Sequence, residues 1–369
     1  MKYFKSDFDS IYIMLGSDCN ANCVYCLQKG EKKNQKLPTE INEDIIDFII
    51  NMAKEYVDYQ NTFPVEDRKY FYITYFGGEP LLYFDKIKYI TKKVTESGVL
   101  FRSSIITNGL LLDKEKVNYL NDNYFTVTLS WDGINTIKTR LFNIFSMKNR
   151  DEILRINDLQ LNAVLTKYSY PMDIFRGVTK INKEYRKVHG YNLKMNIESF
   201  IDTGKCNENM LDDMDEDRLY SEIYSTTMRY LNMDKNNMSP EDTIIYNYVF
   251  NKVNSITYGL NSNEIITRGS CLCGWNHLNM DLQGNFYRCH NSTTPIADIY
   301  STLNRYFTQL SHIDTRTRDT GCNDCEVKYL CHGGCKLIPE ELEEKYCRVQ
   351  RAYYIGFYMA ICDWGKEHG

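Results

Sequence analysis

The sequence predicts an α/β protein built on a parallel sheet, which is either open or barrel-like. Two observations lead to this class: strand-like apolar runs alternate with helical patterns six times up to about residue 200, and chemically distinctive segments follow several of these runs. Alternation of this kind implies right-handed crossovers between parallel strands. Sites in parallel α/β folds form where strands end, so we expect the functional residues there.

The individual elements follow from apolar and β-branched periodicity. The expected strands are residues 11–15, 69–76, 100–107, 125–131, 159–165 and 193–200. The expected helices between them are residues 38–52, 87–94, 111–120 and 174–188. Further on, we expect helices at about 216–234, 240–257 and 349–364, and a hairpin at 277–288 whose turn requires Gly284. The expected domains are residues 1–202, 203–262, 263–348 and 349–369.

Bulk composition limits the function classes. The net charge of −5, from 44 basic and 49 acidic residues, argues against a nucleic-acid partner. The charged N-terminus is not a signal peptide, and no apolar run reaches the ~18 residues that span a bilayer, so we expect a cytoplasmic protein with no membrane partner. In a reducing compartment, 13 cysteines indicate metal binding rather than disulfides.

A dense cysteine loop follows the first expected strand. Cys19, Cys23 and Cys26 can supply three thiolates to one face of a cubane iron–sulfur cluster, which leaves the fourth iron open to another ligand. A zinc ion instead needs a fourth nearby ligand, and the loop contains none. The alternative is therefore a structural zinc site completed from elsewhere in the chain.

Three more distinctive segments lie at expected strand ends. They are Gly77-Gly78-Glu79-Pro80, Thr107-Asn108-Gly109 and Ser130-Trp131-Asp132-Gly133. Because the carboxyl ends of parallel strands meet at one edge, we expect these segments to lie near the cysteine loop.

The cysteine loop, with Tyr25 before its last cysteine, and the Gly-Gly-Glu-Pro turn together resemble the radical S-adenosylmethionine (SAM) superfamily. The resemblance covers residues 10 to about 200 and implies a partial (β/α)6 TIM-like barrel. It also implies a [4Fe–4S] cluster on Cys19, Cys23 and Cys26 that binds SAM through its open iron. Reductive cleavage of SAM then yields a 5′-deoxyadenosyl radical that takes a hydrogen atom from the substrate.

The same resemblance implies cofactor contacts. Gly77 and Gly78 let the backbone approach the methionyl amine, while Glu79, followed by Pro80, offers a carboxylate to it. Ser130 is expected to contact the ribose or carboxylate of SAM, and Tyr25 to lie beside the adenine. Arg140 can also reach the cofactor in principle, but an exposed helical arginine is the simpler expectation.

A second cysteine region, residues 271–347, contains the pattern Cys322-x2-Cys325-x5-Cys331-x3-Cys335 followed by Cys347, and before it Cys273-x10-Gly284-x4-Cys289. These spacings resemble the SPASM domain, an extension of many radical SAM enzymes that carries two auxiliary [4Fe–4S] clusters. By position, the first auxiliary cluster is expected on Cys273, Cys289 and Cys335. The second is expected on Cys322, Cys325, Cys331 and Cys347. Cys271 departs from the usual spacing because it is two residues from Cys273; we expect both to ligate, and the alternative is one spare thiol. Taken alone, the region also fits a pair of zinc ribbons.

SPASM enzymes mostly act on peptides and proteins, so the resemblance predicts a maturase that installs a carbon–carbon or thioether cross-link in a ribosomally made peptide. The alternative is an anaerobic sulfatase-maturating enzyme that oxidises a Cys or Ser to formylglycine. That family carries a catalytic aspartate where this chain has His290, which counts against the alternative. His290 is a candidate general base, although a surface or supporting histidine is the simpler interpretation. A non-catalytic metal-binding scaffold is the alternative of another class.

The resemblance to radical SAM enzymes also implies protein partners. A radical SAM enzyme needs a low-potential electron donor such as flavodoxin or ferredoxin. Many peptide maturases carry an N-terminal leader-binding module of about 80 residues, but only 18 residues precede Cys19. We therefore expect that any leader is recognised by a separate protein or by the helices at 216–257.

Overall fold

The computed structural model describes residues 8–28, 36–198, 210–211, 213–261, 276–314, 322–331, 333–335 and 337–368. Its centre is a nine-stranded sheet with the order β6-β5-β4-β3-β2-β1-β7-β8-β9. Strands β1 to β6 are parallel, and together they form the partial barrel that the sequence predicts. They span Ser10–Met14, Phe71–Phe76, Phe101–Thr107, Thr126–Ser130, Asp158–Val164 and Lys194–Glu198.

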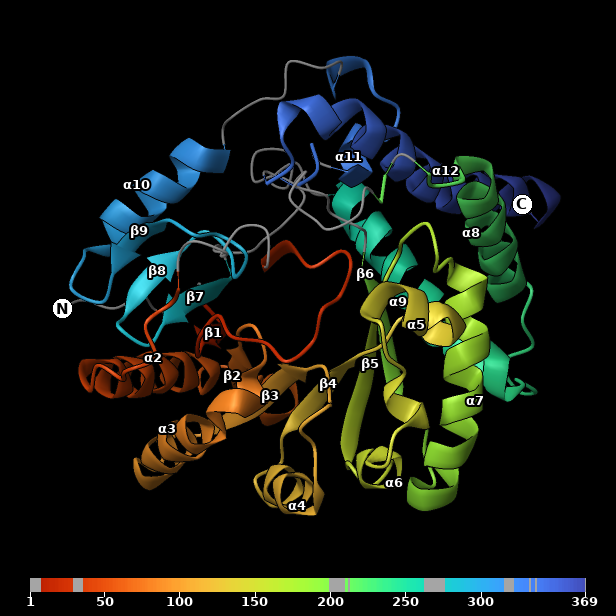
Figure 1. Cartoon of the computed structure of the whole chain (residues 1–369). Coiled ribbons are helices and arrows are strands. Elements are labelled where there is room, and N and C mark those ends of the chain that lie inside the picture. The colour runs from red at the N-terminus through yellow and green to blue at the C-terminus, as the bar shows by residue number, and fades with distance from the viewer. Residues whose placement is uncertain are drawn as a thin grey trace.

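The helices of this half connect successive strands, and the longer ones, α2, α3, α4 and α7, lie along the outer side of the curved sheet (Figure 1). The helices of this half are α2 Asp44–Gln60, α3 Phe84–Glu96, α4 Lys114–Asp122, α5 Thr136–Arg140, α6 Arg150–Ile153 and α7 Pro171–His189. The ends follow local chemistry: Asp113 accepts a bond from the backbone N–H of Lys116 at the start of α4, and α7 ends at Gly190 with φ +79°.

The two faces of the sheet differ in polarity. Residues that face the helices are apolar and fully buried, such as Ile13 in β1, Ile73 in β2 and Val127 in β4. Burying each such side chain contributes about 1.5–3 kcal/mol to stability. The opposite face carries polar residues in adjacent register, including the pairs Thr74 with Ser104 and Asn162 with Asn196. A parallel sheet is usually apolar on both faces, so the polar residues on the inner face of the barrel depart from the usual pattern.

The hairpin expected at 277–288 forms, and it extends the barrel sheet instead of standing apart. Strand β7 (His277–Asp281) pairs in parallel with β1, while β8 (Asn285–Tyr287) and β9 (Pro295–Asp298) continue antiparallel. The turn needs Gly284, which has φ +84°. Backbone bonds therefore tie the second cysteine region directly to β1. The division of the chain into domains stays a prediction.

The remaining helices are α8 Glu216–Leu231, α9 Pro240–Asn261, α10 Leu303–Asp314, α11 Lys328–Cys331 and α12 Glu343–His368. The last helix packs along α8, and Gly356 makes the close approach possible because a Cβ there would lie 2.8 Å from Ile223. Asp215 caps the start of α8. Within the described ranges, no helix is long and apolar enough to cross a membrane.

Candidate active site at the strand ends

The cysteine loop leaves the end of β1 at the carboxyl edge of the sheet. Its sulfur atoms receive N–H groups from three segments of the chain. The backbone N–H of Ala21 lies 3.4 Å from Cys19 Sγ, and Nδ2 of Asn108 lies 3.8 Å from the same sulfur. Nη1 of Arg140 lies 3.9 Å from Cys23 Sγ. Such donors stabilise thiolates and cluster-bound sulfur, which is the chemistry that a metal cluster requires.

The Gly-Gly-Glu-Pro turn is bonded directly onto this loop. The N–H of Gly78 donates to Gly16 O at 3.0 Å, and the N–H of Glu79 donates to Asp18 O at 2.8 Å. A Cβ on Gly78 would lie 2.3 Å from Asp18 O, and one on Gly77 would lie 2.7 Å from Gly16 O. The two glycines are therefore required for the turn to approach the loop. Their predicted approach to the methionyl amine of SAM stays a prediction.

The carboxylate of Glu79 is buried and accepts three hydrogen bonds. The donors are the Thr107 hydroxyl at 2.6 Å, the Asn108 N–H at 2.8 Å and the Leu81 N–H at 3.0 Å. Burial raises the pKa of Glu79 to about 7, although these donors oppose the shift. In this geometry the carboxylate joins the end of β2 to the end of β3. Its predicted contact with the amine of SAM is untested.

A second buried carboxylate, Asp132, joins the cysteine loop to the other side of the barrel. Tyr25 of the loop donates its hydroxyl to Asp132 Oδ2 at 2.8 Å, and Arg140 Nη2 lies 3.1 Å from Oδ1. Burial raises the pKa of the Tyr25 hydroxyl well above its ordinary value. The structure thus places Tyr25 between a carboxylate and a guanidinium; its predicted position beside the adenine of SAM is untested.

The expectation that Arg140 is an exposed helical arginine is wrong. Its side chain is only 7% exposed and forms an ion pair with Asp132 at 3.0 Å. The reason is that α5 is a single short helix that ends at Arg140, after which Leu141 takes φ +67°. The side chain points into the barrel edge, where Asp132 compensates for the loss of hydration.

Ser130 lies half-buried at the end of β4, in register with Asn162 of β5. Asn196 of β6 donates to Asn162 Oδ1 at 3.0 Å, so the polar row continues across the open lumen. Sequence reasoning did not single out Asn162 or Asn196 as site residues, and it named Asp132 only within the segment 130–133, without a role of its own. The signal that was available is a polar residue near the end of each strand, on the face that alternation assigns to the lumen.

His290, the candidate base, packs against side chains of β1 and β2. Its half-buried ring stacks on Tyr12 of β1 with centroids 6.1 Å apart, and it meets Phe76 of β2 edge-on at 4.6 Å. The histidine is therefore part of an aromatic wall between the hairpin and the barrel. A role as general base stays a prediction.

The auxiliary cysteines are described except for Cys271 and Cys273, which lie outside the described residues. Cys289 follows β8 and is buried, with its Sγ 3.3 Å from the Ser292 hydroxyl oxygen. Cys331 and Cys335 both act electrostatically on Tyr346, whose pKa is raised by burial and by these sulfurs.

Arg351 of α12 interacts with both Cys325 and Cys347. Cys347 lies four residues before Arg351 on the same helix, so its interaction with Arg351 follows from the helix and does not test whether the two sulfurs share a site. Cys322 opens the short turn before Cys325 and is half-buried. The assignment of ligands to two clusters is untested.

No three His, Cys, Asp or Glu side chains of the described residues lie close enough to hold a single metal ion. A cubane cluster needs a different arrangement of ligands. Each iron that the protein holds binds one thiolate, so the cysteine sulfurs lie farther apart than they do around a single ion. Burial raises the pKa of the Cys23 thiol to about 11, and Arg140 opposes the shift. Three thiols in one loop, with N–H donors to two of them, fit a cluster better than a lone ion.

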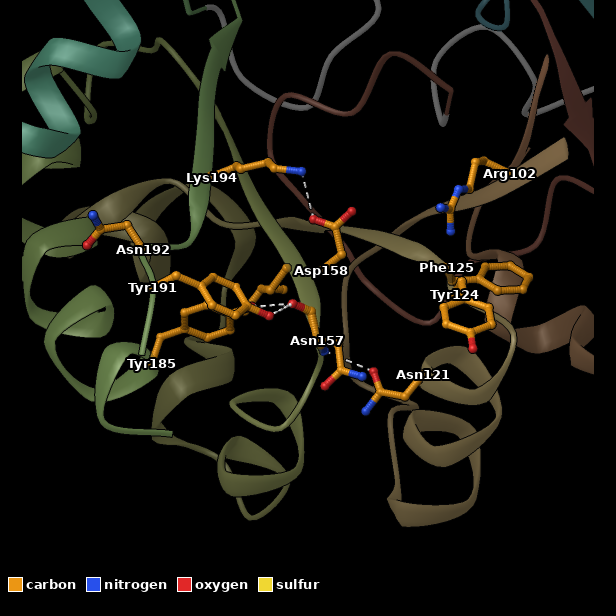
Figure 2. A pocket seen from close by; sticks show the side chains of 11 residues that line it. Arg102, Asn121, Tyr124, Phe125, Asn157, Asp158, Tyr185, Tyr191, Asn192 and Lys194 are labelled. Atoms are coloured by element: carbon orange, nitrogen blue, oxygen red, sulfur yellow. Dashed lines mark hydrogen bonds and ion pairs between the residues drawn. The ribbon is translucent and has the colours of Figure 1, made fainter. Parts of the chain in front are cut away.

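A separate hollow of about 320 Å³ lies at the other end of the barrel strands (Figure 2). Arg102, Asp158 and Lys194 line it, and the last two are the first residues of β5 and β6. Lys194 Nζ lies 2.9 Å from Asp158 Oδ1. Because the cysteine loop lies at the carboxyl ends of these parallel strands, the hollow does not belong to the same site.

Comparison with known proteins agrees with this geometry. Residues 13–180 match the Radical SAM superfamily. A cysteine-type anaerobic sulfatase-maturating enzyme of Clostridium perfringens is 26% identical over 127 residues, but the match spans only 30% of that enzyme and 32% of this chain. The corresponding enzyme of Clostridium novyi is 22% identical over 348 residues, which cover 88% of this chain and 86% of the enzyme.

Solved structures share the fold. Native anSMEcpe with bound AdoMet superimposes with a TM-score of 0.63 at 18% identity, over 97% of this chain and 99% of that chain. Streptococcus suis SuiB bound to S-adenosylmethionine gives a TM-score of 0.57 at 16% identity, over 90% of this chain and 74% of that chain. These likenesses confirm the partial barrel.

Proposed function

Because this chain carries a radical SAM domain, we propose that it is a peptide maturase that installs a carbon–carbon or thioether cross-link in a ribosomally made peptide. The superfamily implies SAM and a [4Fe–4S] cluster as cofactors. The observation that carries the proposal is the union of the cysteine loop and the Gly-Gly-Glu-Pro turn, through two backbone hydrogen bonds, at the mouth of a polar lumen.

The residues present fit these cofactors. Cys19, Cys23 and Cys26 would hold the cluster, and the turn Gly77-Gly78-Glu79-Pro80 with Ser130 and Tyr25 would hold SAM. When bound, the cluster and SAM together supply one-electron chemistry that removes a hydrogen atom from the substrate. The protein's own contribution is to hold the loop and the turn at a fixed distance and to line the space beyond them.

The lumen suits a peptide substrate. Its polar side chains bond one another in the absence of substrate, such as Thr74 with Ser104 at 2.6 Å and Asn196 with Asn162 at 3.0 Å, and backbone amides of a peptide can bond the same types of group. The rings of Tyr12, Phe76 and His290 pack together on the side next to the hairpin and give that side an apolar surface. Native anSMEcpe with a bound Cp18Cys peptide and SuiB bound to precursor peptide SuiA have the same fold.

We further propose two auxiliary [4Fe–4S] clusters that take up the electron left after the cross-link forms. The first would use Cys271, Cys273, Cys289 and Cys335, and the second would use Cys322, Cys325, Cys331 and Cys347. The interaction of Arg351 with Cys325 supports the second set, because a guanidinium offsets the negative charge of ligated sulfur. An external low-potential protein, such as flavodoxin or ferredoxin, would supply the first electron.

Formylglycine formation in a sulfatase is the second candidate. The Clostridium relatives named as cysteine-type anaerobic sulfatase-maturating enzymes favour it. His290, at the position where the resemblance places a catalytic aspartate, counts against it.

The two candidates are separated by one experiment. Reconstituted and reduced enzyme is incubated with SAM and either the small peptide encoded beside its gene or a sulfatase peptide that contains the target cysteine. We expect the first peptide to become lighter by two hydrogen atoms and to show a linked fragment pair in tandem mass spectrometry. Formylglycine in the sulfatase peptide, with the neighbouring peptide unchanged, would overturn the cross-linking proposal.

A further inference from the structure

We propose that the Asp132–Arg140 ion pair is a positioning device for the cysteine loop, which holds a guanidinium against the Cys23 sulfur and thereby eases reduction of the cluster held there. This inference rests on the proposed function, because it concerns the same cysteine loop. It extends that function by assigning a role to two residues outside the cysteine loop and the Gly-Gly-Glu-Pro turn.

The carboxylate of Asp132 is fully buried and ties three segments of the chain together. It accepts from the Tyr25 hydroxyl of the cysteine loop at 2.8 Å and from the Thr139 hydroxyl of α5 at 2.6 Å. It also accepts from the backbone N–H of Val164, the last residue of β5, at 3.0 Å. One side chain therefore joins the cysteine loop to the strand that faces it across the barrel.

A backbone bond reinforces this tie. The N–H of Val24, next to Cys23, donates to Thr139 O at 2.9 Å. The loop is thus held against α5 both by its backbone and by the Tyr25 side chain. Removal of the Asp132 carboxylate should weaken the side-chain tie first, because the Val24 bond does not involve it.

The guanidinium of Arg140 contacts Asp132, the Cys23 sulfur and the Tyr25 ring at the same time. Its Nη2 donates to Asp132 Oδ1 at 3.1 Å, and its Nε lies 3.0 Å from Oδ2 as an ion pair without hydrogen-bond geometry. The remaining nitrogen, Nη1, lies 3.9 Å from Cys23 Sγ. The guanidinium also lies over the Tyr25 ring at 5.5 Å. The planar fork of arginine allows these contacts at once, which lysine cannot reproduce.

A buried ion pair is a costly way to obtain stability alone, because apolar side chains of the same volume often serve as well. An N–H group directed at a cluster-ligating sulfur, in contrast, stabilises the added negative charge of the reduced cluster. The position of Nη1 beside Cys23 is therefore explained by tuning of the reduction potential better than by packing.

The chain contains a matched control. Arg218 likewise pairs with a carboxylate, Asp173, at 2.8 Å and lies over a tyrosine ring, Tyr170, at 4.0 Å. Arg218 lies on α8, is 40% exposed and also pairs with Glu222 at 2.7 Å, and within the described part of the chain it forms no hydrogen bond to a sulfur atom. Arg218→Met therefore makes the same chemical change without removing an N–H from the cysteine loop.

The test is an EPR-monitored redox titration of reconstituted full-length enzyme, in which the signal that changes on addition of SAM identifies the SAM-binding cluster. We expect Arg140→Met to shift the midpoint potential of this cluster to a more negative value, Arg140→Lys to shift it less, and Arg218→Met to leave it unchanged. Equal potentials in wild type and in every Arg140 variant that loads iron would overturn the inference. If Arg140→Met binds no iron, Arg140→Lys decides the question by the same criterion, an unchanged potential counting against the inference.

A measurement on the cofactor-free chain tests the positioning half. We expect Asp132→Asn to speed hydrogen–deuterium exchange in the peptide that contains Val24 and Tyr25, while exchange in the peptide that contains β4 stays slow. Unchanged exchange at the loop would overturn the positioning role. Failure of the wild type to bind iron would count against the proposed function itself, whereas iron binding and SAM cleavage with unshifted potentials would defeat this inference alone.

Discussion

At the scale of single residues, the site depends on close contacts that only particular side chains permit. Gly78 allows the turn after β2 to meet the cysteine loop, and the carboxylates of Glu79 and Asp132 each gather donors from separate segments. A buried carboxylate that accepts several hydrogen bonds is stable. The same carboxylate without partners would lower the stability of the folded protein by about 1–3 kcal/mol or more.

Substitution of Gly78 by Ala should damage the site directly. The new Cβ would lie 2.3 Å from Asp18 O and 2.5 Å from Ser17 O, so the turn must move away from the loop. We expect a loss of about 1–3 kcal/mol in the free energy of unfolding, together with weaker SAM binding measured by calorimetry. Gly365→Ala is the control, because a Cβ there meets nothing within 4 Å; equal effects of the two changes would contradict the account.

The pH dependence of stability should contain a contribution from His277. Burial lowers its pKa from 6.5 to about 4, so between these values the unfolded chain binds more protons than the folded chain. Stability therefore falls as the pH falls through this window. His277→Gln should flatten the dependence, by up to roughly 3 kcal/mol at about 1.4 kcal/mol per pKa unit.

Urea denaturation of both proteins from pH 4 to pH 7 measures this effect. His368→Gln, at the exposed end of α12, serves as the control for a histidine change. Parallel curves for wild type and His277→Gln would show that His277 does not contribute.

Residue-level prediction from the sequence succeeded where a role depends on local chain geometry. The need for glycine in the hairpin turn is confirmed by φ +84° at Gly284. The exposure expected for Arg140 was wrong, because its guanidinium lies over the Tyr25 ring at 5.5 Å and beside Cys23, which is 117 residues away in the sequence. Side-chain partners at such separation leave no periodic signal that a single sequence can display.

At the scale of elements, the strands were predicted within a few residues. The expected 159–165 and 193–200 correspond to Asp158–Val164 and Lys194–Glu198, because buried strands have clear apolar alternation. Less was predictable where elements are short: α5 and α6 have too few turns to show a helical period. The pairing of β7 with β1 was also not foreseen, since register between distant strands depends on tertiary packing.

The contact between α8 and α12 should support the second cysteine region, because Cys347 lies in α12. A larger side chain at Gly356 would press on Ile223 and on Tyr220 O, which lie 2.8 Å and 3.0 Å from the position of a Cβ. We expect Gly356→Leu to lower the free energy of unfolding by about 1–3 kcal/mol and to lower the iron content. Tyr358→Ala, on the exposed face of the same helix, should have little effect on either measurement.

At the scale of the whole molecule, β1 links the two cysteine regions. Its carboxyl end leads into the cysteine loop, and its edge pairs with β7 of the hairpin that leads to Cys289. The fold class, the parallel sheet and the radical SAM relationship were all available from the sequence. The continuity of one sheet through both cysteine regions was not available from the sequence. Because β1 and β7 are hydrogen-bonded neighbours, we expect a displacement of one region to move the other.

We infer that the cysteine loop enables reductive cleavage of SAM. The most direct test is 5′-deoxyadenosine formation by reduced wild-type enzyme and by the variant in which Cys19, Cys23 and Cys26 are all changed to Ala. With three [4Fe–4S] clusters, the wild type should bind about 12 irons and the variant about 8. We predict that the variant keeps its remaining iron but forms no 5′-deoxyadenosine above background; formation at the wild-type rate would contradict the account.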